Sequence, residues 1–166
     1  MNLDVEQLLE SVSQQTSALL TQLSINQPLL VGIRTGGIWV AEHLHHTLGL
    51  KNEMGMLDIS FYRDDFSRLG LNPQVKPSQL PLDITDEHII LVDDVLHTGR
   101  TVRAALNELF DYGRPASVHL AVLVDRGSRE LPIYAHLAGK RIDLPPHQHV
   151  KLTGPDPLQI EVITTS

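Results

Sequence analysis

The sequence has no cysteine, and this absence excludes several kinds of chemistry at once. Without a thiol the chain has no disulfide, no thiolate metal site and no cysteine nucleophile. It also lacks any apolar stretch near the roughly 20 residues that a membrane-spanning helix requires. Asp4, Glu6 and Glu10 stand where a secretory signal would carry lysine or arginine. The sequence therefore predicts a soluble protein of the cytoplasm with no membrane partner.

An excess of basic residues is missing as well. The chain has 13 Lys+Arg against 20 Asp+Glu, a formal net charge of -7. General binding to nucleic acid needs lysine and arginine to neutralise phosphates, so only a local basic patch remains open. The basic residues near the C-terminal half look like scattered solvated charges: Arg114, Arg126, Arg129, Lys140 and Arg141.

Length and apolar content favour one domain. The 166 residues, 42% of them hydrophobic, suffice for one sizeable core and are too few for two comfortable domains. The chain shows no linker and no internal repeat, so residues 1–166 are expected to form a single domain.

Apolar periodicity predicts an α/β protein. Steps of three and four over residues 8–23 indicate an amphipathic helix, and two more helical patterns end near Gly49 and Gly113. Four short apolar runs are typical of strands: residues 29–33, 54–62, 88–92 and 117–124. Strands that alternate with helices predict a mainly parallel central sheet flanked by helices.

Two regions fall outside that alternation. Residues 63–81 are polar and lack clear periodicity, and a loop of this length is often functional, so we expect a mobile loop. Three extended pieces near the C-terminus are broken by prolines: residues 135–142, 147–152 and 158–163. They are expected to form a small C-terminal cap, or hood, over the sheet edge.

The most informative stretch is IILVDDVLHTGRT, residues 89–101. An apolar strand leads into Asp93 and Asp94, at the carboxyl end of a parallel strand, where open α/β sheets bind ligands. Carboxylates at this place accept hydrogen bonds from sugar hydroxyls. Residues 95–100 are expected to curl so that backbone N–H groups and the positive end of the next helix face a phosphate. Thr98 and Thr101 add hydroxyl donors, and Gly99 allows positive φ and close approach of an oxygen. The stretch thus predicts a site for a ribose 5-phosphate.

A structural interpretation of the same residues remains open. Acids and threonine are ordinary helix N-caps, so Asp93 and Asp94 by themselves equally suit a capped helix start with solvated carboxylates. The full thirteen-residue context favours the ligand site. The stretch is not a P-loop, because the G-x-x-x-x-G-K-[ST] order and its lysine are missing.

The segment VDDVLHTGRT resembles the phosphoribosyl pyrophosphate (PRPP) signature of type I phosphoribosyltransferases. Three other segments extend the resemblance over nearly the whole chain: GIRTGGIWVAEHL, DISFYRDD and LAVLVDRGSRELPI. They are similar to members that join uracil to PRPP and also attenuate pyrimidine operons. The resemblance implies the type I phosphoribosyltransferase fold, conversion of uracil and PRPP to UMP and pyrophosphate, and a dimer or higher homo-oligomer. The alternative it implies is an RNA-binding attenuation protein for pyrimidine operon mRNA with little or no enzymatic activity.

The same resemblance assigns roles to single residues. Asp93 and Asp94 would hold the ribose hydroxyls. The next seven residues would enclose the 5-phosphate: Val95, Leu96, His97, Thr98, Gly99, Arg100 and Thr101. Thr35 and Gly36 match the family's pyrophosphate loop, although Gly36 stands where many relatives carry arginine. His97 stands where relatives often have tyrosine, so its imidazole is expected to be a tolerated side chain rather than a catalyst.

Three more positions complete the implied site. Arg63 would meet the pyrophosphate leaving group and so act with the two acids in catalysis; the alternative is a surface ion pair with a neighbouring aspartate. Arg126 would lie beside the nucleotide, and Val150 in the hood would meet the base through its backbone. Residues 63–80 would close over the site to exclude water. Asp125 is open to a structural interpretation, bonded to nearby amides.

The resemblance also implies Mg²⁺, bound mainly through PRPP and pyrophosphate with few direct protein ligands. Two histidine groups suggest a protein metal site: His43, His45 and His46, and His147 with His149. The first is expected on a solvent-facing helix without a carboxylate at ligand spacing apart from Glu42, and the second lies in a proline-flanked loop, so neither is expected to bind a metal. Trp39, on the helix after the pyrophosphate loop, is expected to pack in the core rather than to stack on a base.

Overall fold

A computed structural model describes residues 2–59, 78–81 and 83–166. Its centre is a five-stranded sheet in the order β2-β1-β3-β4-β5, in which every neighbouring pair is parallel. The strands are β1 (Leu29–Ile33), β2 (Gly55–Leu57), β3 (His88–Leu96), β4 (Ser117–Asp125) and β5 (Leu137–Arg141). Most residues of β1, β3 and β4 are buried, as in strands covered on both faces. The predicted parallel sheet is confirmed.

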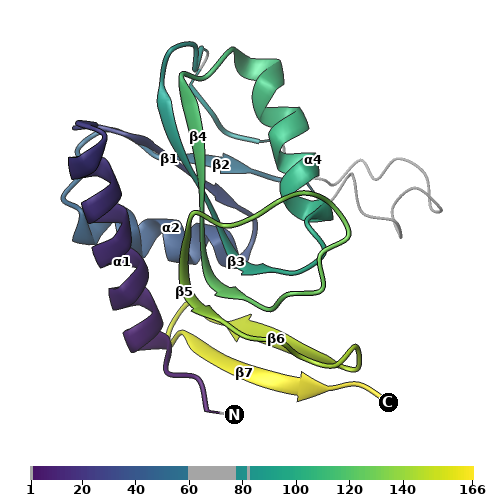
Figure 1. The fold of residues 1–166 in the computed structure, drawn as a ribbon. Helices are drawn as coiled ribbons and strands as arrows, with labels where there is room; N and C mark the ends of the chain where they lie inside the picture. The colour runs from purple at the N-terminus through teal and green to yellow at the C-terminus, as the bar shows by residue number, and fades with distance from the viewer. Residues whose placement is uncertain (1, 60–77, 82) are drawn as a thin grey trace.

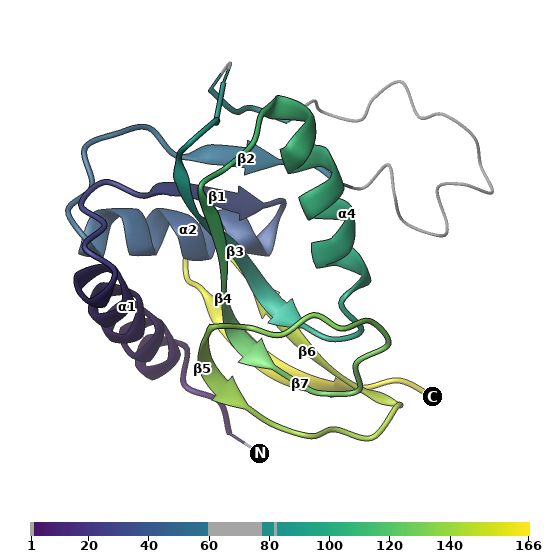
Figure 2. The same cartoon turned by 45° about the horizontal axis from the view of Figure 1, so that its top comes forward.

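Helices cover both faces of the sheet (Figures 1 and 2). The helices α1 (Val5–Gln22) and α2 (Gly36–Thr47) lie on one face, and α4 (Arg100–Leu109) lies on the other. A short 3-10 turn, η2 (Phe110–Tyr112), continues α4 up to Gly113, where the helical pattern predicts the end. Each face has its own hydrophobic cluster, because successive residues of a strand alternate between the two faces.

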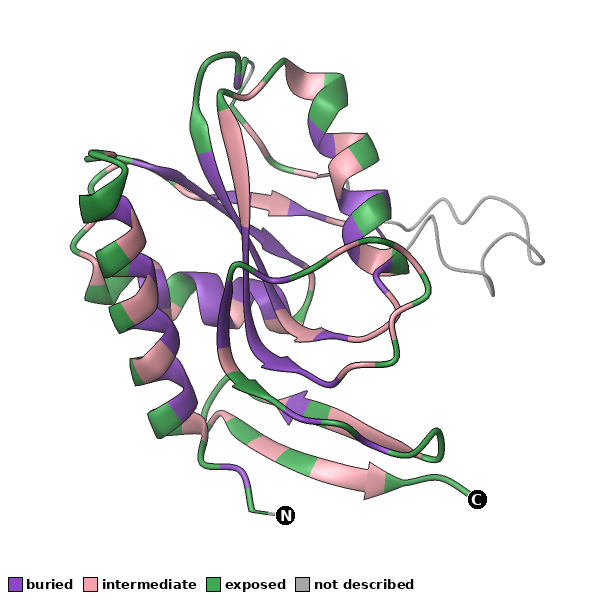
Figure 3. Cartoon of the chain, in the orientation of Figure 1, coloured by how far each residue is buried: buried purple, intermediate pink, exposed green. Residues whose placement is uncertain are grey.

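The N-terminal helix forms where the periodicity predicts it. The Asp4 side chain accepts hydrogen bonds from the backbone N–H groups of Glu6 and Gln7, and so caps the helix. Leu8, Val12 and other buried residues line the face of α1 that packs on the sheet, while its outer face is exposed (Figure 3). A long-range bond from Gln15 Nε2 to the Ala138 carbonyl, 2.8 Å, ties α1 to β5.

The C-terminal strands β6 (Gln148–Thr153) and β7 (Gln159–Thr164) form an antiparallel hairpin that is separate from the main sheet. This hairpin is the hood; it lies beyond the carboxyl ends of β3 and β4 (Figure 1). The predicted hood is thus present, but its first piece is wrong: residues 137–141 are β5. The register Ala121↔Leu137 buries the start of this strand at the sheet edge, and the short sequence alone does not show that pairing.

Two predicted strand lengths are also corrected. β3 does not end at Val92 but continues to Leu96, because Val95 and Leu96 still pair with β4. The second predicted strand shrinks to the three residues of β2 among those described. The predicted loop of residues 63–81 lies outside the described residues except for its end, where Gln79 bridges Met56. In the described part of the chain no helix has the length and apolarity to cross a membrane.

Candidate active site at the carboxyl ends of the strands

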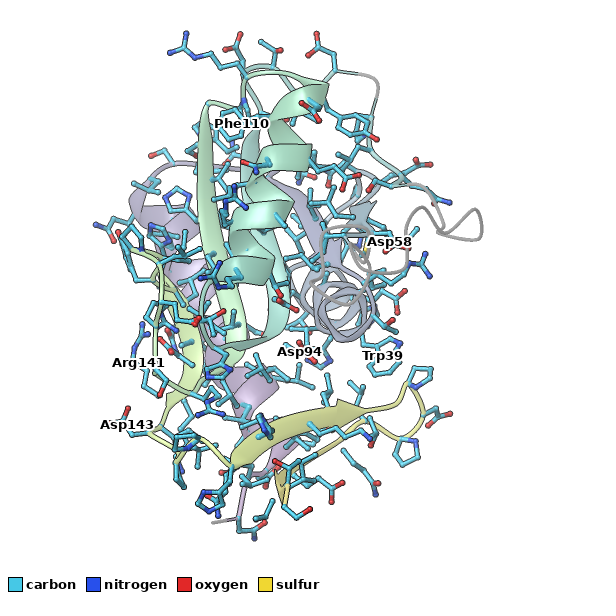
Figure 4. All side chains as sticks on the ribbon, turned by 90° about the vertical axis from the view of Figure 1, so that its right-hand side faces the viewer. Trp39, Asp58, Asp94, Phe110, Arg141 and Asp143 are labelled. Atoms are coloured by element: carbon cyan, nitrogen blue, oxygen red, sulfur yellow. The ribbon has the colours of Figure 1, made fainter. Side chains whose placement is uncertain are left out.

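The acid pair lies in the last half of β3. Asp93 is 6% exposed, and Asp94 is half-buried. Each carboxylate accepts a hydrogen bond from the next backbone amide: Asp93 Oδ1 from Asp94 N and Asp94 Oδ1 from Val95 N, both 2.9 Å. Figure 4 shows Asp94 beside α2, on the side of the sheet that faces the hood. The acids are therefore held in a strand and do not cap a helix, so the capping alternative is wrong.

The predicted pyrophosphate loop reaches the same place from β1. Thr35 is the exposed N-cap residue of α2, and Gly36 is its first residue. A Cβ added to Gly36 would lie 2.3 Å from Asp94 Oδ2, so the helix begins directly against this carboxylate. Unpaired amides at a helix N-terminus carry a positive partial charge that favours anions. Thr35, Gly36 and Asp94 are thus brought together as expected.

The predicted phosphate loop is shorter than the sequence indicates. Val95 and Leu96 belong to β3, and Leu96 is buried in the core. The turn itself consists of residues 97–99, here called the phosphate turn, and α4 begins at Arg100. Gly99 has φ 95°, the left-handed conformation that glycine adopts without strain. The Thr98 hydroxyl accepts a hydrogen bond from Arg100 N at 3.2 Å within the turn, while Gly99 is the N-cap residue of α4.

Arg126 connects the end of β4 to the hood. Its side chain is 1% exposed; Nη1 donates to the Gln148 carbonyl at 2.5 Å and Nη2 to the Leu144 carbonyl at 3.1 Å. Its Nε is buried and forms no hydrogen bond within the described residues. Val150, two residues after Gln148, pairs with Val162 inside the hairpin. The structure therefore brings Arg126 to the hood strand that carries Val150, and the interpretation of Arg126 as a solvated charge is wrong.

His97 lies against a second histidine, which sequence reasoning did not foresee. Its ring and the His149 ring of the hood are 6.5 Å apart and nearly perpendicular. Burial lowers the pKa of His97, and the positive charge of Arg126 and interaction with His149 lower it further. The imidazole is thus favoured in its neutral form where the phosphate turn meets the hood.

Two residues near the pyrophosphate loop, Arg34 and Asp58, were not among the site residues predicted from the sequence. Arg34 Nε lies 3.8 Å from Asp58 Oδ2, and a cavity of about 240 Å³ opens beside Arg34, Thr35 and Trp39. Both missed residues stand inside the quoted motifs GIRTGG and DISFYRDD, so their position was the available signal. Trp39 contacts the tip of the hood, since a Cβ on Gly154 would lie 3.3 Å from its ring, and it packs against the core cluster as predicted.

The strand β4 ends at Asp125, the centre of an ion-pair network. Asp125 accepts from Gly127 N at 3.1 Å, which confirms its structural interpretation, and it also pairs with Arg129 and Arg141. Burial raises the pKa of Asp125, but the hydrogen bonds from Arg129 and Gly127 and the two arginine charges outweigh burial and hold this pKa below its usual value. Arg129 is therefore not a scattered solvated charge.

Arg63, the predicted contact of the pyrophosphate leaving group, lies outside the described residues.

The available donors suit a magnesium ion that the substrate carries. No group of three or more His, Asp or Glu side chains among the described residues is arranged to hold a metal. In the first histidine group, His45 Nε2 lies 2.5 Å from the Asn52 carbonyl. Asp93 and Asp94 offer carboxylate oxygens, the ligand type that Mg²⁺ prefers, beside a helix N-terminus that suits phosphates.

Comparison with known proteins identifies the class that this fold and site define. The family model for the phosphoribosyl transferase domain matches residues 3–149, so the chain belongs to the phosphoribosyltransferase family. The named relatives of the chain narrow its place within this family. The bifunctional protein PyrR of Nitrosococcus oceani is 54% identical over 98% of this chain and 93% of its own length. The bifunctional protein PyrR of Pseudomonas fluorescens is 54% identical over 93% of this chain and 92% of its own length. Within the family, the chain is thus of the PyrR type.

Solved structures share the fold at much lower identity. A hypoxanthine-guanine phosphoribosyltransferase from Bacillus anthracis has a TM-score of 0.65 at 17% identity, over 86% of this chain and 80% of its own. A hypoxanthine phosphoribosyl transferase from Trypanosoma cruzi has a TM-score of 0.64 at 19% identity, over 84% and 76%. At these identities the likeness shows the fold alone, and it confirms the predicted phosphoribosyltransferase fold.

Proposed function

We propose that this chain transfers the phosphoribosyl group of PRPP to uracil, which yields UMP and pyrophosphate. One observation carries the proposal. The N-terminus of α2 lies against Asp94 of β3, and β3 continues directly into the phosphate turn and α4. Two helix N-termini and two acids at one sheet edge suit a ligand with a phosphate at one end, a diol in the middle and a pyrophosphate at the other. The PyrR type of the relatives supports uracil as the base.

In the proposed reaction, a ring nitrogen of uracil forms a bond to the anomeric carbon while the bond to pyrophosphate breaks. The transition state has oxocarbenium character, as in glycosidic chemistry. Asp93 and Asp94 hold the ribose hydroxyls, and the phosphate turn with the first turn of α4 holds the 5-phosphate. Thr35 and Gly36 hold the pyrophosphate, whose growing charge is stabilised by the α2 N-terminus. Positioning and charge stabilisation together account for the catalysis.

The base is proposed to lie between the strand ends and the hood. Val150 meets it through its backbone, and Arg126 holds the hood strand that presents Val150. Closure of residues 63–80 would keep water from the anomeric carbon, and Arg63 would stabilise the leaving group; both stay predictions. Magnesium, when bound, neutralises charge on the departing pyrophosphate. The magnesium ion would be bound mainly by the substrate, and Asp93 and Asp94 are the residues proposed to hold the substrate and its ion in the site.

The central test measures PRPP consumption and pyrophosphate release with Mg²⁺, with uracil, hypoxanthine, guanine or orotate as the competing base. We expect release with uracil and little or none with the other three. Release with hypoxanthine or guanine but not with uracil would reassign the base. A protein that releases pyrophosphate with none of the four bases is not a phosphoribosyltransferase of the proposed kind.

The acid pair is tested by Asp94→Asn. Loss of the carboxylate charge beside the ribose should lower kcat/KM about 100-fold or more, comparable to removing one transition-state contact. The melting temperature should stay close to that of the parent, because Asp94 is half-buried and asparagine keeps its shape. The matched control is Asp111→Asn in the exposed turn η2, which should keep full activity. Full activity of Asp94→Asn would remove this residue from the site.

A second function is proposed on the name of the relatives, which are called bifunctional. The chain would also bind pyrimidine operon leader RNA, with UMP in the same pocket biasing the RNA-binding form. Gel-shift titration with leader RNA at several salt concentrations, with and without UMP, tests it. Binding that UMP does not change would contradict the linkage.

The proposed unit is the whole of residues 1–166 as one domain. The family match ends at residue 149, inside β6. Arg126 donates to Gln148 at the start of β6, and Trp39 lies close to Gly154 beyond the match. A homodimer or higher homo-oligomer in the cytoplasm is proposed from the resemblance alone, and light scattering of the purified protein measures its size.

A further inference from the structure

The segment that follows β4 packs against the phosphate turn, on the side to which the carbonyl groups of the turn point. Three backbone amides of this segment, residues 126–133, donate to the turn and to the end of β3. Arg126 N donates to the Leu96 carbonyl at 3.0 Å, and Glu130 N and Leu131 N donate to the Thr98 carbonyl at 2.9 and 3.1 Å. The side chain of Arg129 adds a fourth bond, from Nη1 to the His97 carbonyl at 2.5 Å. We call residues 126–133 the brace.

The Arg129 side chain is held in place by Asp125. Nη2 of Arg129 donates to both carboxylate oxygens, at 2.8 and 2.9 Å. The Asp125 side chain is 8% exposed and the Arg129 side chain 22%. A partly desolvated guanidinium with a fixed carboxylate partner has a defined direction, unlike a solvated surface charge. The direction here is toward the His97 carbonyl.

Gly99 shows how closely the brace approaches the turn. A Cβ at this position would lie 3.1 Å from Ile133 Cβ and 3.5 Å from Arg129 Cδ. The turn therefore packs closely on the brace, and a side chain at position 99 would press on Ile133.

The bonds from behind decide where the amides of the turn point. In a trans peptide the C=O and the following N–H point in opposite directions. The His97 carbonyl is directed at Arg129, so the Thr98 N–H points away from the brace. The Thr98 carbonyl is directed at Glu130 N and Leu131 N, so the Gly99 N–H also points away from it. Two successive N–H groups with a shared direction form an anion-binding concavity.

We infer that Arg129, held by Asp125, is a positioning residue for phosphate binding: it fixes the peptide between His97 and Thr98 so that the amides of the turn face the 5-phosphate. The inference rests on the proposed function and deepens it. Arg129 itself does not touch the substrate. It acts from the far side of the turn, through hydrogen-bond geometry.

Arg129→Met and Arg129→Lys test this inference against the matched control Arg141→Met. Arg141 also pairs with Asp125, at 2.9 Å, but its other bond goes to the Ala135 carbonyl and not to the turn. We expect Arg129→Met to raise KM for PRPP about tenfold, the loss of one charged hydrogen bond, and to leave KM for uracil within about twofold. Arg129→Lys should recover little of this loss, because an ammonium cannot hold Asp125 and the carbonyl in the same fork geometry. Arg141→Met should keep the parental KM for PRPP within about twofold.

Other results would overturn the inference. An unchanged KM for PRPP in Arg129→Met shows that the turn needs no brace. Full recovery in Arg129→Lys shows that charge near the phosphate, rather than geometry, is what matters. Equal losses in Arg129→Met and Arg141→Met show that the ion-pair network only stabilises the fold.

Binding of ribose 5-phosphate, measured by calorimetry, separates this inference from the proposed function. If the parent binds ribose 5-phosphate but turns over no base, the proposed reaction is wrong, and the affinity of the three variants still tests the brace. About tenfold weaker binding by Arg129→Met alone supports the inference, whereas equal affinity in all variants rejects it. A parent that neither binds ribose 5-phosphate nor releases pyrophosphate with any base rejects both.

Discussion

At the scale of single residues, two adjacent glycines decide how closely α2 approaches β3. A Cβ on Gly36 would lie 2.3 Å from Asp94 Oδ2 and 2.7 Å from Asp94 Cγ, which belong to a side chain and not to the backbone. A Cβ on Gly37 would lie 2.5 Å from the Val92 carbonyl oxygen, which is backbone inside the sheet. The close approach of the pyrophosphate loop to the acids therefore depends mainly on Gly37.

The two glycines make a matched pair for a stability measurement. Both lie in α2, so alanine brings each the same gain in helix propensity, about 1 kcal/mol. Gly37→Ala should nevertheless be less stable than Gly36→Ala by about 1–3 kcal/mol, because backbone must move to admit its methyl group. Urea unfolding at pH 7 measures the difference. Equal stability of the two variants would show that β3 and α2 separate at little cost.

At the scale of elements, α1 covers one face of the sheet and closes the larger hydrophobic cluster. Leu9 is 1% exposed on the inner face of this helix, while Leu23, its C-cap residue, is 43% exposed. The helix supplies no residue to the proposed site. Its contribution is to keep β4 and β5 in place, and the ends of these strands carry the Asp125 network.

Truncation of side chains on α1 should separate stability from activity. Leu9→Ala should lower the free energy of unfolding by about 2–5 kcal/mol, since it leaves a cavity under the helix. Leu23→Ala, at an exposed position, should change it by less than about 0.5 kcal/mol. Chemical denaturation measures both, and the two variants should keep parental KM values at temperatures where they are folded. A raised KM for PRPP in folded Leu9→Ala would tie α1 to the site.

At the scale of the whole molecule, histidines within the fold should couple stability to pH. Burial lowers the pKa of His97, His119 and His136, with further lowering by nearby positive or histidine groups. The His119 and His136 rings lie 4.9 Å apart, and His119 Nδ1 is buried without a hydrogen-bond partner among the described residues. Protonation of these rings is therefore easier in the unfolded chain.

The sign of the pH effect is set by that difference. Below the unfolded value of 6.5 the unfolded chain binds more protons than the folded one, so stability should fall as the pH drops from 7 toward 5. Asp125 acts in a lower window: its lowered pKa stabilises the fold above the ordinary aspartate value of 3.8, and this contribution is lost under more acidic conditions. Melting temperatures at pH 7, 6 and 5 test the histidine part. The double variant His119→Gln, His136→Gln should show a shallower decline than the parent, and a parent equally stable at all three values would contradict the argument.

The sequence by itself determined the features whose signal is local. Apolar periodicity over 8–23 predicted α1, because a helix that buries one face repeats its core residues every three to four positions. The continuous apolar run 29–33 predicted β1 with its bounds, because a strand covered on both faces buries every residue. The order strand, acid pair, glycine turn, helix predicted the site, because the loops after parallel strands all lie at the same edge of the sheet.

Only the tertiary structure decided the features that depend on pairing between distant segments. β3 extends past the acids because β4 supplies partners up to Asp125, and two aspartates do not signal a strand. Arg129 and the His97 carbonyl are 32 residues apart, and Arg126 and the Gln148 carbonyl 22 apart, so no spacing rule links them. A guanidinium looks the same in a sequence whether it is solvated or bonded to carbonyls; burial and the direction of those carbonyls separate the two, and both arise only when the strands are assembled.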